Sequence, residues 1–160
     1  MIAFELRFNP NAALLRIVRR FVSSFYEGVL TDEDAISRLA LATHELLENA
    51  VKYALDGATA LSISVEPTPD AAARILIRLR NRAAPEHIEA LRVLFAEMGR
   101  YADPSAHYLA AMERSAKSKV GSGLGIARVR TEGEMSMSYT IEGDEVSIVA
   151  EARIQSGGSR

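Results

Sequence analysis

The chain has 160 residues, of which 48% are apolar and 25% charged, and its formal net charge is −2. This length suffices for one domain with its own core, and neither composition nor charge indicates a general nucleic-acid-binding surface. The chain has no cysteine, which excludes disulfides, thiol catalysis and cysteine metal sites. No apolar run reaches membrane-spanning length and the N-terminus has no signal-peptide core, so we expect a cytoplasmic protein without membrane contact.

The first predicted elements are one strand and two helices. Residues 2–8 alternate apolar and polar side chains, which is typical of a strand with one covered face. Residues 12–28 have the apolar spacing of a helix. The next helix is expected to begin at Thr31, a capping hydroxyl followed by three acidic residues, and to end near Asp56 and Gly57.

The rest of the chain completes an α+β pattern. The remaining predicted elements are, in chain order, strands over 61–66 and 74–81, helices over 85–101 and 105–119, a short helix ending near Gly133, and a hairpin over 135–141 and 146–152. This predicts a two-layer sandwich: an antiparallel-dominated, mixed five-stranded sheet with helices on one face. We expect a single domain over 2–154, with a helical lid insertion at about 86–119 and a disordered tail at 155–160.

The long second helix carries a polar stripe opposite its apolar one. Glu45 and Asn49 lie one turn apart, with Glu48 and Lys52 on the same side. A carboxylate and an amide oxygen so placed can hold a hydrated Mg²⁺ and orient a water or hydroxyl. Any solvated helix face shows the same pattern, so both interpretations stay open on the stripe alone.

A glycine cluster, Gly121-Ser122-Gly123-Leu124-Gly125, stands before the short helix. Exposed backbone amides of such a loop, together with a helix N-terminus, attract phosphate, although an ordinary turn gives the same signal. The cluster follows no strand and the chain has no Gly-x-x-x-x-Gly-Lys-Ser/Thr, which argues against a dinucleotide fold and a P-loop.

Asn81 is a polar residue at the end of a predicted strand, in phase with the apolar positions of that strand. A polar side chain directed at the covered face must find a hydrogen-bond partner. The partner could be a backbone group or a ligand, and the strand pattern leaves the two open.

The two motifs are informative in combination. A Glu-x-x-x-Asn helix, two strands, a lid-like stretch, a Gly-Ser-Gly-Leu-Gly turn, a helix and a closing hairpin resemble the GHKL ATPase/kinase superfamily of histidine kinases, topoisomerase ATPase domains and anti-sigma-factor serine kinases. The resemblance spans about residues 2–154. The leading strand, the small size and the lack of a phosphotransfer helix make the chain most similar to the anti-sigma-factor, partner-switching branch. It is also similar to regulators of the SiaB type.

The resemblance implies a role for each motif residue. Asn49 would bind Mg²⁺, which bridges the phosphates of ATP, and Glu45 would be the general base toward the attacking hydroxyl. The phosphates would be wrapped by Gly121, Gly123, Leu124 and Gly125, with Lys52 adding positive charge. The implied partner is a small antagonist protein or a sigma-factor-like protein, not nucleic acid. Because members of this branch are often dimers, a homodimer is also considered.

The chain departs from the family at the adenine-binding box. The family has Asp-x-Gly-x-Gly, whereas this chain runs from Asn81 to Pro85 without glycine. Asn81 keeps an acceptor oxygen for the adenine amino group but loses the charge, and Pro85 stiffens the segment. Two functions therefore stand beside each other: a Mg-ATP-dependent Ser/Thr protein kinase acting on an antagonist, and a catalytically inactive module that sequesters a partner.

Overall fold

A computed structural model describes residues 1–55, 58–70, 72–118 and 123–155. In chain order the elements are β1 (Ile2–Phe8), α1 (Ala12–Val29), α2 (Glu33–Tyr53), β2 (Thr59–Pro67), β3 (Ala72–Arg82), α3 (Pro85–Met98), α4 (Pro104–Lys117), α5 (Leu124–Thr131), β4 (Ser136–Glu142) and β5 (Glu145–Gln155). Within these ranges, no helix has an apolar stretch of the length that a bilayer crossing requires.

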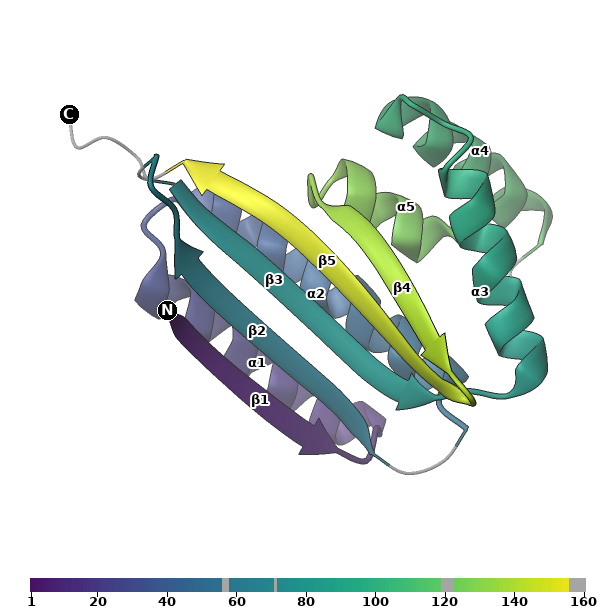
Figure 1. Ribbon diagram of the computed structural model, residues 1–160, viewed down its shortest axis with the longest axis horizontal. Helices are drawn as coiled ribbons and strands as arrows, with labels where there is room; N and C mark the ends of the chain where they lie inside the picture. The colour runs from purple at the N-terminus through teal and green to yellow at the C-terminus, as the bar shows by residue number, and fades with distance from the viewer. Residues whose placement is uncertain (56–57, 71, 119–122, 156–160) are drawn as a thin grey trace.

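The strands form one sheet in the order β1-β2-β3-β5-β4. Each pairing along this order is antiparallel, so the predicted sheet is antiparallel throughout rather than mixed. Helices α1 and α2 lie across one face of the sheet, and α3, α4 and α5 gather beside the β5–β4 edge (Figure 1). The predicted α+β two-layer sandwich is confirmed.

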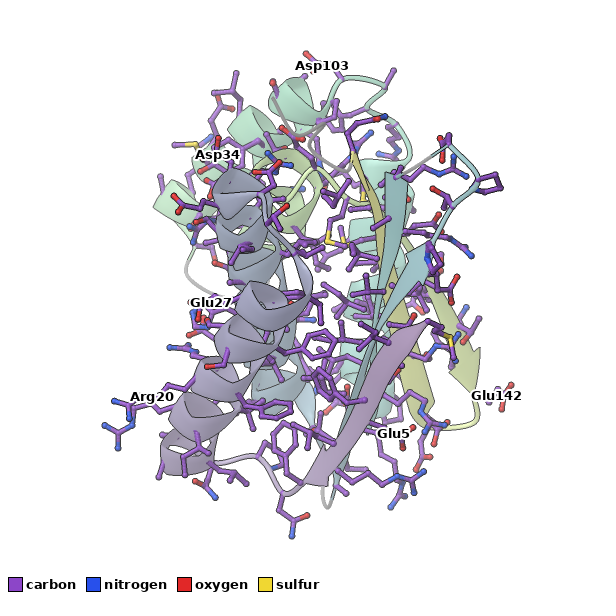
Figure 2. All side chains as sticks on the ribbon, turned by 90° about the vertical axis from the view of Figure 1, so that its left-hand side faces the viewer. Glu5, Arg20, Glu27, Asp34, Asp103 and Glu142 are labelled. Carbon is purple, nitrogen blue, oxygen red and sulfur yellow. The ribbon has the colours of Figure 1, made fainter. Side chains whose placement is uncertain are left out.

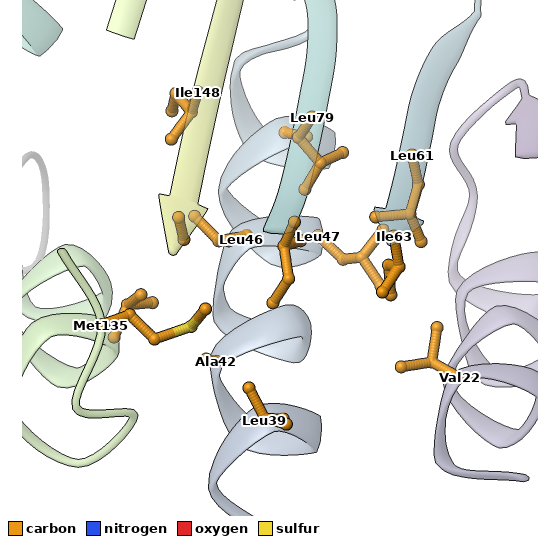
Figure 3. Packing of buried hydrophobic residues seen from close by; sticks show 14 of the residues in the cluster. Val22, Leu39, Ala42, Leu46, Leu47, Leu61, Ile63, Leu79, Met135 and Ile148 are labelled. Atoms are coloured by element: carbon orange, nitrogen blue, oxygen red, sulfur yellow. The ribbon is translucent and has the colours of Figure 1, made fainter. Parts of the chain in front are cut away.

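The core lies between the sheet and α2. The inward side chains Ile63, Ile75 and Ile77 are fully buried, as are Leu39 and Leu47 of α2. Figure 3 shows α2 leucines facing Leu61, Ile63 and Leu79 of the sheet. The opposite face of the sheet carries polar side chains such as Glu5 (Figure 2), so the period-two pattern of each strand separates a dry face from a wet one.

Both ends of α2 differ from the prediction. Asp32, not Thr31, caps the helix, because its carboxylate accepts a 3.0 Å hydrogen bond from the Ala35 amide. Both residue types cap well, and backbone geometry selects between them. The helix ends at Tyr53, since Ala54 forms a bridge to Ala83. Asp56 and Gly57, the predicted end, lie outside the described residues.

The predicted insertion is helical and packs on the domain. Leu91 and Phe95 of α3 are buried, and the Phe95 ring lies 4.6 Å from that of Tyr139 on β4, centroid to centroid. From α5, Arg130 donates hydrogen bonds to the carbonyls of Met98, the last residue of α3, and of Tyr101, between α3 and α4. The role of this insertion as a lid stays a prediction. Of the disordered tail predicted over 155–160, Gln155 is instead the last residue of β5, and residues 156–160 lie outside the described ranges.

A buried hydroxyl pair joins α1 to α2. The Tyr26 and Thr43 side-chain oxygens are 2.9 Å apart, and the Thr43 hydroxyl donates to the Leu39 carbonyl at 2.8 Å, so the Tyr26 hydroxyl donates to Thr43. Burial also raises the pKa of Tyr26, which keeps it protonated.

Removing either member of the hydroxyl pair should destabilise the fold by different amounts. Thr43→Val leaves the Tyr26 hydroxyl buried without an acceptor, so we expect a loss of about 2 kcal/mol, against about 1 kcal/mol for Tyr26→Phe. Urea denaturation of both variants measures this difference. Equal losses would contradict the assigned direction of the hydrogen bond.

Candidate functional site

A pocket lies where the C-terminal ends of α2 and β3 meet α3 and the start of β5. It contains about 390 Å³ of space free of atoms, part of it open to solvent. It is lined by Asn49, Tyr53, Asn81, Ala83, His87, Ala90, Leu91, Leu94, Val146 and Ile148. A mostly apolar wall with a few polar groups is typical of small-molecule sites.

The polar groups of the pocket are two amides and two rings. Asn49 and Asn81 were predicted separately from the sequence, and both line this pocket. The Asn81 amide nitrogen donates to the Arg82 carbonyl at 3.2 Å. The rings of Tyr53 and His87 lie 4.9 Å apart at a 59° angle. Apolar walls, amides and rings together suit a flat heteroaromatic group that forms a few hydrogen bonds.

The segment that replaces the glycines of the adenine box is built into the fold. Ala83 and Ala84 are buried, and the Ala83 amide donates to the Asp144 carbonyl at 2.9 Å. Pro85 is the first residue of α3, a position where its fixed φ is favourable. The backbone on this side of the pocket is therefore held by packing and by the helix start.

The glycine turn reaches the pocket and α2 together. Gly123 has φ +70°, which favours glycine, and a Cβ there would lie 2.6 Å from the Leu94 side chain of the pocket wall. A Cβ on Gly125 would lie 2.9 Å from Oε2 of Glu45. Gly123 thus lies against the pocket wall and Gly125 against Glu45, which is distant from both glycines in the sequence.

Glu45 is enclosed by this turn and by an ion pair. Its side chain is 11% exposed, and Oε1 accepts a 2.6 Å hydrogen bond from Nη1 of Arg128. Burial raises the pKa of Glu45 above its ordinary value, and the Arg128 guanidinium opposes this increase. A mostly buried carboxylate with a raised pKa is a stronger base than an ordinary glutamate.

Comparison with known proteins identifies the family of this chain. The family model of the histidine kinase-like ATPase domain matches residues 8–149. The chain belongs to this family. No curated protein sequence matches it significantly. A chain of the crystal structure of the SiaB-SiaC complex from Pseudomonas aeruginosa has a similar fold, with a TM-score of 0.65 and 17% identity over 93% of this chain and 89% of that one.

A histidine kinase-like ATPase domain is expected to use Mg²⁺, so we ask which side chains near the pocket could bind it. No cluster of three or more His, Asp or Glu side chains able to hold a metal occurs in the described parts of the chain. Asn49 offers one neutral oxygen in the pocket, and Mg²⁺ is commonly held by one or two protein oxygens plus substrate phosphates and waters. The site fits a metal that arrives with a nucleotide.

Two predicted residues contribute less to the geometry of the site, and a third is not described. Lys52 is exposed, with its Nζ 5.2 Å from the ring centroid of Tyr53. Leu124 is the first residue of α5 and is half-buried. Gly121 lies outside the described residues. The phosphate-binding roles of these three residues stay predictions for this histidine kinase-like ATPase domain.

His44 and Glu48 of α2 form a cluster with Arg19 of α1. Arg19 contacts the His44 ring nitrogen at 2.8 Å and the Glu48 carboxylate at 2.7 Å. These contacts join the outer faces of α1 and α2. No residue of the cluster lines the pocket that contains Asn49.

Sequence reasoning missed the residues around Glu45. Arg128 on α5 contacts it, and Glu132 and Tyr108 complete the arrangement from α5 and α4. The available signal was a basic residue close to one helical turn after Gly125, on a helix expected to approach Glu45. A salt-bridge partner so distant in sequence cannot be chosen from periodicity.

Proposed function

We propose that this protein is a partner-switching regulator that transfers the γ-phosphoryl group of ATP, with Mg²⁺, to a serine or threonine of a small antagonist protein. One observation carries the proposal. The Glu45 carboxylate lies against Gly125, and Gly123 lies against Leu94 in the wall of the pocket that Asn49 and Asn81 also line. A base, a phosphate loop and a nucleotide pocket would then be contiguous.

Each part of a nucleotide would then meet a different wall of the pocket. The base would lie between the apolar side chains of α3 and β5, with the Asn81 oxygen as acceptor for an amino group. The phosphates would extend toward Gly123 and Gly125, where missing side chains let backbone approach closely. Asn49 would hold Mg²⁺, which neutralises charge on the phosphates.

Glu45 would act as the general base in the transfer. Its carboxylate takes the proton of the attacking hydroxyl, the hydroxyl oxygen forms a bond to the γ-phosphorus, and the bond from that phosphorus to the bridging oxygen of ADP breaks. The positive end of α5 and the amides of the glycine turn stabilise charge on the transferred group. Positioning and charge stabilisation account for most of such catalysis.

The partner is proposed from the structural relative. That relative was solved in a complex named for two proteins, SiaB and SiaC, and its chain is covered over 89% of its length by the fold described above. By analogy, the partner of this chain would be a small antagonist protein, with a sigma-factor-like protein as the other class. Transfer to the antagonist would change which partner it binds.

One observation favours the second function, a binding module without catalysis. The buried Ala83–Pro85 segment replaces the glycines of the adenine box, and Asn81 lacks the charge that strengthens the bond to an adenine amino group. Such a module would bind a partner while Mg-ATP has no effect. Partner binding that does not change on adding Mg-ATP would therefore favour it over the kinase.

The proposed function is tested with Mg-ATP and an antagonist-type protein encoded beside the gene of this chain. We expect intact-protein mass spectrometry to show one added phosphoryl group on a serine or threonine of that protein. Omitting Mg²⁺ should abolish the addition. If the two proteins bind stably but the antagonist stays unmodified, the kinase function is contradicted and the binding-module function is favoured.

Gly125→Ala should displace the base. The new Cβ would lie 2.9 Å from Oε2 of Glu45, so the carboxylate must move, and a shift of about 1 Å in a reacting group can reduce the rate by about 10²-fold. We expect ADP formation from Mg-ATP to fall by at least about tenfold with little change in thermal stability. Gly28→Ala, which meets no atom within 4 Å, is the matched control. Unchanged ADP formation in Gly125→Ala would contradict the close approach.

A further inference from the structure

The two oxygens of the Glu45 carboxylate have different surroundings. Oε1 accepts the 2.6 Å hydrogen bond from Nη1 of Arg128. Oε2 lies toward the glycine turn, 2.9 Å from where a Cβ of Gly125 would be. We propose that Arg128 is a positioning residue, which holds Oε1 so that Oε2 is presented to the hydroxyl beside the phosphate end of the pocket. This inference rests on the proposed phosphoryl transfer.

Arg128 can position the carboxylate because its second terminal nitrogen is held by another side chain. Its Nη2 lies 3.3 Å from Oε2 of Glu132, the residue that follows the last turn of α5. Oε1 of Glu132 accepts a 3.0 Å hydrogen bond from the Tyr108 hydroxyl on α4. A planar guanidinium fixed at two nitrogens has little freedom to rotate, so its contact with Glu45 is directional.

The positive charge of Arg128 also stabilises the ionised form of Glu45. The Glu45 carboxylate is mostly buried, and its negative neighbours are Glu48 and Glu132. Besides Arg128, its positive neighbour is Arg19 of α1. Burial and the two acids raise the pKa of Glu45, and Arg128 is the largest influence that lowers it. A general base must be ionised before it accepts a proton, so Arg128 favours the active form.

Three variants separate orientation from charge. Arg128→Gln removes the positive charge and the guanidinium geometry. Arg128→Lys keeps the charge but lacks the planar guanidinium group. Arg38→Gln is the matched control, because Arg38 is also on the helical layer, is 32% exposed against 33% for Arg128, and lies 3.7 Å from a different carboxylate, that of Glu134. Each variant is compared with the parent in ADP formation from Mg-ATP and in the titration of Glu45.

The titration is measured on the nucleotide-free protein by carboxyl-carbon NMR. In Arg128→Gln we expect the pKa of Glu45 to rise, with the parent value kept in Arg38→Gln and largely kept in Arg128→Lys. A pKa of Glu45 that does not move in Arg128→Gln would overturn the proposal. Because this readout needs no ATP, it is decisive even if the parent protein forms no ADP, a result that would refute only the proposed function.

The rate measurement tests orientation. We expect ADP formation to fall by about 10²-fold in Arg128→Gln, with its acidic limb moved to higher pH, and to recover only in part in Arg128→Lys. Arg38→Gln should keep the parent rate. Full recovery in Arg128→Lys would overturn the positioning role, because charge alone would then suffice. An unchanged rate in Arg128→Gln would overturn it as well.

Discussion

Glu45→Gln is expected to slow phosphoryl transfer by about 10²- to 10⁴-fold, because an amide cannot take the hydroxyl proton. Affinity for Mg-ATP should stay within about twofold, since the substitution preserves shape and removes an interaction made only in the transition state. Transfer is measured as phosphorylated antagonist, and affinity as the Kd of Mg-ATP by calorimetry.

Glu48→Gln is the matched control for Glu45→Gln. It removes the same charge from the same helix, but the Glu48 side chain is 52% exposed and paired with Arg19 rather than with the glycine turn. Because Glu48 also raises the pKa of Glu45, the rates are compared at a pH well above that pKa, where we expect Glu48→Gln to transfer as fast as the parent. Equal slowing in both variants would point to a general charge effect, and the role of Glu45 as base would be wrong.

Asn49→Ala is expected to remove the Mg²⁺-dependent part of nucleotide binding. Asn49 supplies a neutral oxygen to the pocket wall, and alanine supplies none. The Kd of ATP in the presence of Mg²⁺ should rise by at least about tenfold, which is about 1.4 kcal/mol, whereas binding of adenosine should not change. Calorimetric titrations with ATP and with adenosine, each with and without Mg²⁺, measure this.

Asn81→Ala, unlike Asn49→Ala, should weaken binding of the base whether or not Mg²⁺ is present. It removes the acceptor expected to face the base, so adenosine and Mg-ATP should weaken by the same factor, independently of Mg²⁺. The two variants thus separate the metal end of the pocket from the base end. If Asn49→Ala binds Mg-ATP as tightly as the parent, the metal assignment fails.

Much of the fold could be predicted because local patterns specify it. The alternation in Ile2–Phe8 and the helical spacing in Glu33–Tyr53 depend only on which face is covered. The strand order could not be predicted, because β5 inserts between β3 and β4 and no local signal selects that neighbour. The choice of Asp32 over Thr31 as cap also depends on backbone geometry beyond the sequence.

The candidate site was only partly predictable for a similar reason. The spacing of Glu45 and Asn49 places them on one face of a helix, which a helical repeat alone implies. Their approach to Gly123 and Gly125 depends on the whole sheet and was expected only from the family resemblance. Arg128 was missed, because periodicity gives the face of a residue but not the distant side chain that it meets.

The central claim is that Glu45, Asn49 and the glycine turn surround one site for Mg-ATP. Titration of the unmodified protein with Mg-ATP in a calorimeter tests this most directly. The proposed site predicts saturable binding at one site per chain that weakens when Mg²⁺ is removed. No heat of binding and no thermal shift up to millimolar Mg-ATP would contradict it.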